Sequence, residues 1–209
     1  LIQKEIEALN ILTKNPLGRK TLAIIGGGKM DDKMALLKNM CKKMDTIYIC
    51  GGNINSLLKN DLNDYVEEIT SHKSNIVFME DGLCARNFED FPQLKNTDLL
   101  DNDESFFDIG FKSLHTLHKL IQSHDVIFWN GTLGVVEDEK YKKGSELCVQ
   151  LIKTEMENNS KKTVIVGGGD TGGFVNNYDH NYTHISTGGG ASIEYITFDG
   201  LVGLKQFNL

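Results

Sequence analysis

The stretch TLAIIGGGK, residues 21–29, carries the main clue to the fold, because a short apolar run ends there in three glycines and a lysine. The pattern returns along the chain, and a helical stretch follows most of the runs. The runs are TLAII (21–25), TIYIC (46–50), NIVFM (75–79), DVIFW (125–129), TVIVG (163–167) and THIS (183–186). Continuously apolar runs are typical of strands covered on both faces. Their alternation with helices predicts a doubly wound α/β fold, with a Rossmann-like six-stranded parallel sheet in three layers.

The helices are predicted from the spacing of their apolar residues. A stripe at intervals of four and three residues predicts a helix over 30–44 and consists of Met30, Met34, Leu37, Cys41 and Met44. Residues 2–14, 112–122 and 137–158 are predicted helices too, and NPLG (15–18) ends the first of them. The segment 80–105 is polar and acidic and has no clear period, which predicts a long surface loop. Residues 1–20 are therefore a helix with a lead-in, and 21–209 form one domain.

Composition narrows the class of protein. Of the 209 residues 40% are hydrophobic and 24% charged, which is ordinary for a globular chain. The net charge of -7 disfavours nucleic-acid binding, because phosphate backbones repel an acidic chain. Cysteines at 41, 50, 84 and 148 lack metal-ligand spacing and are expected to be buried thiols in a reducing compartment, which favours the cytoplasm. No apolar run has the length of a membrane span, and the first residues do not resemble a signal peptide.

Glycine clusters follow five of the predicted strands. They are GGGK (26–29), GGN (51–53), NGTLG (130–134), GGGDTGG (167–173) and STGGG (186–190). The carboxyl ends of parallel strands meet at one edge of the sheet, where ligands bind, and glycine lets the backbone approach them. Five such loops predict a polyphosphate site. Neither the dinucleotide fingerprint nor the Walker A loop is matched, so a dinucleotide-dependent oxidoreductase is disfavoured.

Four charged residues near these loops have a functional and a structural interpretation. Lys29 and Lys33 share a helix face and could flank an anion, or could be solvated surface lysines. Asp170 could hold Mg²⁺ on a nucleotide, cap a helix, or do both. Glu137 could bind a ribose hydroxyl or be an ordinary first-turn acid.

Among the histidines, His184 is expected to be structural and the other five are expected to lie at the surface. No Ser–His–Asp arrangement is visible.

Five segments, in order, resemble the signature segments of phosphoglycerate kinase. They are GGGKMDDKM (26–34), FDIGFKS (107–113), FWNGTLGVVE (128–137), GGGDT (167–171) and HISTGGGAS (184–192). The resemblance covers the whole chain as the family's C-terminal half, from its interdomain helix (2–14) to DGLVGLKQF (199–207). It implies a domain that binds ADP or ATP with Mg²⁺. The N-terminal half, which binds 3-phosphoglycerate in this family, has no counterpart in the chain.

The resemblance also implies roles for individual residues. Lys29 corresponds to the lysine that follows the transferred phosphoryl group, and Lys33 to the lysine on the nucleotide phosphates. Asp170 corresponds to the magnesium ligand. Thr171, Gly168 and Gly169 correspond to contacts with the phosphates, Asn130 to a contact on the phosphate side, and Glu137 to the ribose contact. The walls of the adenine slot correspond to Gly51, Gly52 and Gly110. The helix N-terminus that stabilises the transferred phosphoryl group corresponds to Gly188, Gly189 and Gly190.

The chain departs from the family pattern at several loops. Cys50 replaces one glycine of a triplet that the family has in its second loop, and Thr132 and Phe111 replace prolines. Gly172 and Gly173 replace residues such as alanine and threonine. The stretch between Gly52 and Asp108 is also shorter than usual. Two hypotheses follow: the nucleotide-binding half of a working kinase, with its acceptor half in cis or in trans, or an inactive relative that serves as a structural or regulatory subunit of a larger assembly.

Overall fold

The computed structural model describes residues 2–15, 17–28, 34–59, 75–179, 181–186 and 195. The elements of this part of the chain are α1 (Ile2–Lys14), β1 (Thr21–Ile25), α2 (Met34–Met40), β2 (Thr46–Ile49), α3 (Asn53–Lys59), β3 (Asn75–Phe78), β4 (Asp81–Ala85), β5 (Gln93–Asn96), the 3₁₀ helix η2 (Thr97–Leu99), β6 (Ser105–Ile109), α5 (Phe111–Ser123), β7 (Val126–Asn130), α6 (Lys143–Asn158), β8 (Thr163–Gly167), α7 (Gly169–Val175) and β9 (His184–Ser186).

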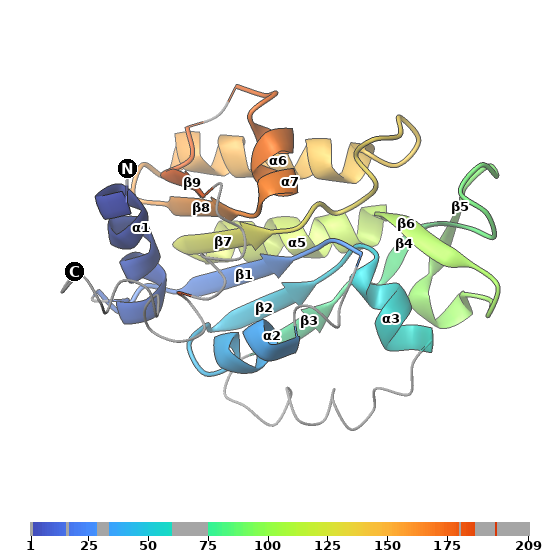
Figure 1. The fold of residues 1–209 in the computed structure, drawn as a ribbon, viewed down its shortest axis with the longest axis horizontal. Helices are drawn as coiled ribbons and strands as arrows, with labels where there is room; N and C mark the ends of the chain where they lie inside the picture. Colours follow the sequence, from blue (N-terminus) through green and yellow to red (C-terminus); the bar gives the residue numbers. More distant parts are fainter. Residues whose placement is uncertain are drawn as a thin grey trace.

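The larger of the two sheets has six strands in the order β3-β2-β1-β7-β8-β9. Every neighbouring pair in it runs parallel. The central strands β1, β7 and β8 are buried along their whole length, as expected from their continuous apolar runs. In Figure 1, α5 and α6 lie behind this sheet, whereas α2 and α7 lie in front of it. The predicted α/β fold with six parallel strands is therefore confirmed.

The segment 80–105 was wrongly predicted to be a surface loop. It contains β4, β5 and η2 and reaches the start of β6. Strand β4 pairs antiparallel with both β5 and β6, which makes a three-stranded sheet. Figure 1 shows this small sheet beyond the carboxyl ends of the first three parallel strands. Strand β5 in particular has no recognisable sequence pattern, because it is partly exposed and does not alternate polar with apolar residues.

The helix predictions hold in part. Helices α1 and α5 match the predicted ranges 2–14 and 112–122, whereas α2 covers 34–40 of the predicted 30–44 and residues 29–33 lie outside the described part. Helix α6 begins at Lys143 rather than at residue 137, because the residues before it form turns. Of the helices in the described residues, none has the length and apolar content that crossing a bilayer requires.

The structure also shows how far the cysteines and one histidine are buried. All four cysteines are buried thiols, as predicted. His124, expected at the surface, is instead buried at the end of α5. Its ring nitrogens lie 2.9 Å from the hydroxyl of Thr46 and 2.7 Å from the carbonyl of Leu120, so polar partners from two elements satisfy it.

Candidate functional site

A cleft of about 420 Å³ opens at the carboxyl edge of the parallel sheet. Five segments line it: the loop after β1 (27–28), the loop after β2 with the start of α3 (Gly52 and Asn55), strand β6 (105–107), the loop after β7 (132–137) and Asp170 at the start of α7. Its volume lies within the range of about 300–1,000 Å³ that is usual for small-molecule sites. Three residues predicted for the site, Gly52, Glu137 and Asp170, therefore come together in one cleft.

The loops after β1 and β7 touch each other backbone to backbone. The amides of Gly26 and Gly27 donate to the carbonyls of Asn130 and Thr132, both at 2.8 Å. Gly131 has a φ of +89°, and a Cβ atom there would lie 2.1 Å from the carbonyl oxygen of Gly26. Glycine is thus required at this crossing both by backbone conformation and by space. The contact fixes the floor of the cleft.

Asn130 and Thr171 hold the loops together. Nδ2 of Asn130 donates to the carbonyl of Gly167 at 3.0 Å, and the hydroxyl of Thr171 accepts from the amide of Gly131 at 2.8 Å. Both side chains belong to buried residues. The structure therefore engages these two predicted phosphate-side residues with neighbouring loops, where they set the positions of the glycines.

Two carboxylates reach the cleft from opposite loops. Asp170 and Glu137 are both exposed, and within the described residues neither carboxylate takes part in a hydrogen bond or an ion pair. An exposed carboxylate beside backbone amides is a suitable oxygen ligand for Mg²⁺, which takes its other ligands from phosphates and water. The described residues hold no cluster of three or more acidic, histidine or cysteine side chains, so a metal ion here would depend on such outside ligands.

Part of the cleft wall is apolar. It includes Phe107 of β6 and Val135 and Val136 of the loop after β7, which are partly exposed, whereas the neighbouring Phe106 is buried. The side-chain amide of Asn55 bonds the backbone of Phe106 twice, donating to its carbonyl at 2.9 Å and accepting from its amide at 2.8 Å. Asn55 thereby ties α3 to β6. An apolar wall together with exposed carboxylates suits a ligand with one aromatic and one charged end.

The other predicted site residues lie around this cleft or elsewhere. Gly51 packs against Gly27 and Thr132. Gly110 lies at the N-cap of α5, where a Cβ atom would come 2.3 Å from the carboxyl carbon of Asp81. Gly168 and Gly169 precede Asp170 at the start of α7, and His184 lies in β9. The other residues predicted for the site lie outside the described part of the chain; they are Lys29, Lys33, Gly188, Gly189 and Gly190.

Sequence reasoning missed Asn55, Ser105 and Phe106. Ser105 and Phe106 lie in or beside the segment expected to be a loop, and Asn55 follows a glycine pair without a charged or catalytic side chain. No local signal marks them, since their place in the cleft depends on the pairing of β6 with β4.

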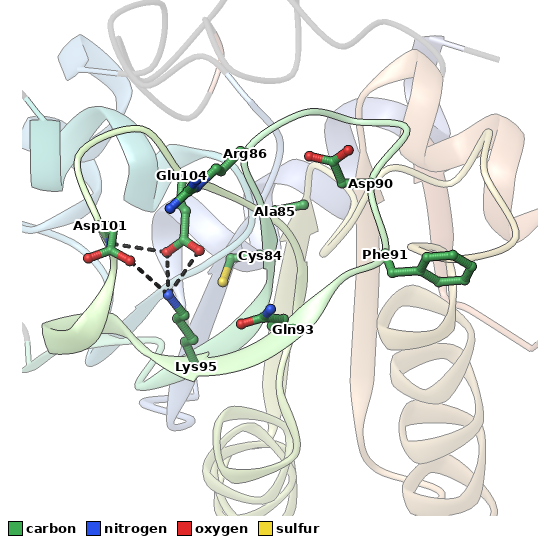
Figure 2. Close-up of a pocket in the computed structure, with 9 residues that line it drawn as sticks. All are labelled: Cys84, Ala85, Arg86, Asp90, Phe91, Gln93, Lys95, Asp101 and Glu104. Atoms are coloured by element: carbon green, nitrogen blue, oxygen red, sulfur yellow. Dashed lines mark hydrogen bonds and ion pairs between the residues drawn. The ribbon is translucent and has the colours of Figure 1, made fainter.

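A second hollow, of about 330 Å³, lies in the small antiparallel sheet (Figure 2). Figure 2 shows the ammonium group of Lys95 between two carboxylates, 3.0 Å from Asp101 and 2.7 Å from Glu104. Arg86, on the same wall, pairs with Asp103 at 3.1 Å. Both cations of this hollow are thus paired with carboxylates, and Lys95 keeps the pKa of both its partner acids low. It is a structural ion-pair network rather than a ligand site.

Comparison with known proteins agrees with this geometry. The family model for phosphoglycerate kinase matches residues 1–198. The chain belongs to the phosphoglycerate kinase family. Among similar proteins, the phosphoglycerate kinase of Clostridium tetani is 33% identical over 100% of this chain and 55% of its own length. That of Finegoldia magna is 34% identical over 98% of this chain and 55% of its own length.

Solved structures give the same result. The phosphoglycerate kinase of Coxiella burnetii has a TM-score of 0.87 and 28% identity, over 100% of this chain and 57% of that one. The phosphoglycerate kinase of Pyrococcus horikoshii shares the fold, with a TM-score of 0.76 and 21% identity over 99% of this chain and 55% of that one. The chain therefore spans about half the length of the relatives it matches.

Proposed function

We propose that this chain is the C-terminal, nucleotide-binding half of a phosphoglycerate kinase and that its cleft binds MgADP or MgATP. With an acceptor-binding half supplied in cis or in trans, it would take part in reversible phosphoryl transfer between 1,3-bisphosphoglycerate and ADP. The observation that carries the proposal is the cleft itself, which joins glycine loops, two exposed carboxylates and an apolar wall at the carboxyl edge of the sheet.

Each part of the cleft has a task in this proposal. The wall of Phe107, Val135 and Val136 would pack against the base, and Glu137 would bind the ribose. The backbone at Gly27 and Gly28 would lie along the phosphates. The sequence continues from Gly28 directly into Lys29, and Lys33 follows four residues later, so two cations are available to offset the phosphate charge.

Asp170 would hold magnesium on the phosphates, and the bound ion would neutralise part of their negative charge. Phosphoryl transfer relies on positioning and charge neutralisation more than on covalent chemistry. The residues of this chain would accordingly orient the nucleotide, and Lys29 with Gly189 and Gly190 would stabilise the phosphoryl group in transit. The acceptor must come from outside the cleft described above.

Calorimetric titration with MgADP tests the proposal. Wild type should bind saturably, and Lys33→Ala and Asp170→Ala should each bind clearly more weakly. Asp98→Ala is the matched control, since Asp98 is likewise an exposed acid in the first turn of a helical segment but lies away from the cleft. If wild type does not bind, the proposal fails and the alternative of an inactive structural or regulatory subunit is favoured. If wild type binds, ATP formation with an acceptor half added tests the catalytic part.

A further inference from the structure

Asp108 is a buried acid that the proposed binding roles leave unused. It lies near the end of β6, and only 1% of the residue is exposed. Its carboxylate accepts hydrogen bonds from the amides of Gly144, at 2.8 Å, and Ile109, at 2.9 Å. Gly144 belongs to the first turn of α6, so Asp108 caps that helix from another element. Burial, with a smaller contribution from Glu146, raises the pKa of Asp108 to about 7.

The carboxylate of Asp108 is packed between two glycines. A Cβ atom on Gly134 would lie 2.2 Å from its Oδ1, and one on Gly144 would lie 2.3 Å away. Gly134 belongs to the loop after β7 and Gly144 to the start of α6. The carboxylate therefore fills the space in which β6, this loop and α6 meet.

The same joint carries much of the cleft. The loop after β7 supplies Glu137 and both valines of the apolar wall. It is bonded to β6 through the amide of Val135 and the carbonyl of Phe107, at 2.9 Å, and to α6 through the amide of Leu133 and the hydroxyl of Ser145, also at 2.9 Å. A displacement at Asp108 would therefore move β6 and the loop after β7, two adjoining segments of the cleft, relative to each other.

We propose that Asp108 is a positioning residue for the base and ribose of the nucleotide: it sets the distance between β6 and the loop after β7. This inference rests on the proposed function. The glycines at 27–28 and Asp170 come from other elements, so the phosphate end of the cleft should depend on Asp108 much less.

The chain offers a matched control in Asp81. This residue is also a buried aspartate, 1% exposed, near a strand end. Its carboxylate caps α5 in the same manner, accepting from the amides of Ser113 at 2.8 Å and Lys112 at 3.2 Å. It packs against Gly110 as Asp108 packs against Gly134. It does not hold the loop after β7, so its loss should cost stability without changing the cleft.

The test compares Asp108→Asn with Asp81→Asn in titrations with MgADP and with magnesium tripolyphosphate. Asparagine keeps the shape of the side chain but replaces one carboxylate oxygen with an NH₂ group. That group cannot accept a hydrogen bond from the amide of Gly144 or Ile109. At about pH 8, where the carboxylate is mostly ionised, Asp108→Asn should weaken MgADP binding about tenfold, the equivalent of one charged hydrogen bond, and tripolyphosphate binding by less than about twofold. Asp81→Asn should change neither affinity, although it should unfold at lower temperature. Ser145→Ala, a milder change in the same joint, should give the same split with a smaller loss and serves if Asp108→Asn does not fold.

Three results would overturn the inference: unchanged MgADP affinity in Asp108→Asn and Ser145→Ala, an equal loss for both ligands, or the same loss of MgADP affinity in Asp81→Asn. If wild type binds neither ligand, the proposed function itself fails. If wild type and the Asp108 variant bind MgADP equally well, only the inference about Asp108 fails.

Discussion

The two edges of the parallel sheet use charge in opposite ways. At the amino edge, Nη2 of Arg19 donates to the carbonyls of Asp125 and Lys161, at 2.9 and 2.7 Å, and to the hydroxyl of Thr163 at 2.8 Å. Lys162, which is buried, donates to backbone carbonyls at the end of α5. These cations are satisfied within the protein, so the amino edge serves stability.

At the carboxyl edge the charges face outward. Asp170 and Glu137 are exposed at the cleft without partners among the described residues. The groups that are satisfied there, such as Asn130 and Thr171, belong to the frame that positions the loops. The contrast shows which charges a ligand has still to satisfy, and it predicts that stability and binding can be changed separately.

The largest effect is expected where the two roles cannot be separated. Gly131→Ala places a Cβ atom 2.1 Å from the carbonyl oxygen of Gly26 and demands a positive φ. It should cost about 3–5 kcal/mol of stability, the range of severe single substitutions, and weaken MgADP binding as well. Thermal unfolding and titration measure both effects.

Gly173→Ala is the control for this change. Gly173 lies in α7 with nothing within 4 Å of an added Cβ atom. There alanine should stabilise the helix by about 0.5–1 kcal/mol. A Gly131→Ala variant as stable as wild type would contradict the account of the loop crossing.

Lys162→Met should lower stability alone. The substitution keeps the apolar stem but leaves buried carbonyls of α5 without a donor, at a cost of about 2–3 kcal/mol. Affinity for MgADP should stay within about twofold of wild type, because the lesion is at the opposite edge. The check is denaturant unfolding beside titration, with Lys161→Met as the exposed neighbour. Weaker MgADP binding by Lys162→Met would contradict the claim that the amino edge affects stability alone.

Asp170→Asn should do the reverse. MgADP affinity should fall about tenfold or more, while loss of a helix N-terminal charge should cost at most about 1 kcal/mol of stability. Titration at fixed magnesium measures the first and thermal unfolding the second. Equal affinity would mean that this carboxylate does not face the nucleotide.

Acidification should change stability in two opposite directions, one at each edge of the sheet. Burial lowers the pKa of His124 in the folded state, so the unfolded state takes up more protons as pH falls through about 6.5 and stability is lost. The raised pKa of Asp108 acts in the other sense: between about 7 and the unfolded value near 4, the folded state binds more protons and gains stability. Each contribution is at most about 1.4 kcal/mol per pH unit.

Urea unfolding at several pH values separates the two groups. His124→Gln should remove the loss on acidification and leave a gain, whereas Asp108→Asn should remove the gain and leave a loss. Parallel pH profiles for the two variants would contradict the assignment.

The sequence predicts the parallel sheet well because its central strands are buried and continuously apolar. It predicts the contents of the cleft less well. Strand β5 (QLKN) is partly exposed, so its residues carry no period. The start of α6 was placed at residue 137 because acids follow there, yet the cap of the helix is Asp108, 36 residues before Gly144. The burial of His124 at the end of α5 has no local signal either, because its partner Thr46 lies in β2. Partners that are distant in sequence leave no local pattern.

The most direct test of the account is to map the amides that respond to MgADP by two-dimensional NMR. If the nucleotide binds in the cleft, shifts should appear along the carboxyl edge, at residues 26–28, 51–55, 105–108, 131–137 and 168–171. Little change is expected along the amino edge, at 19–21, 124–126 and 161–163. Shifts concentrated at the amino edge, or no shifts at high ligand concentration, would contradict the claim that the carboxyl edge is a nucleotide site.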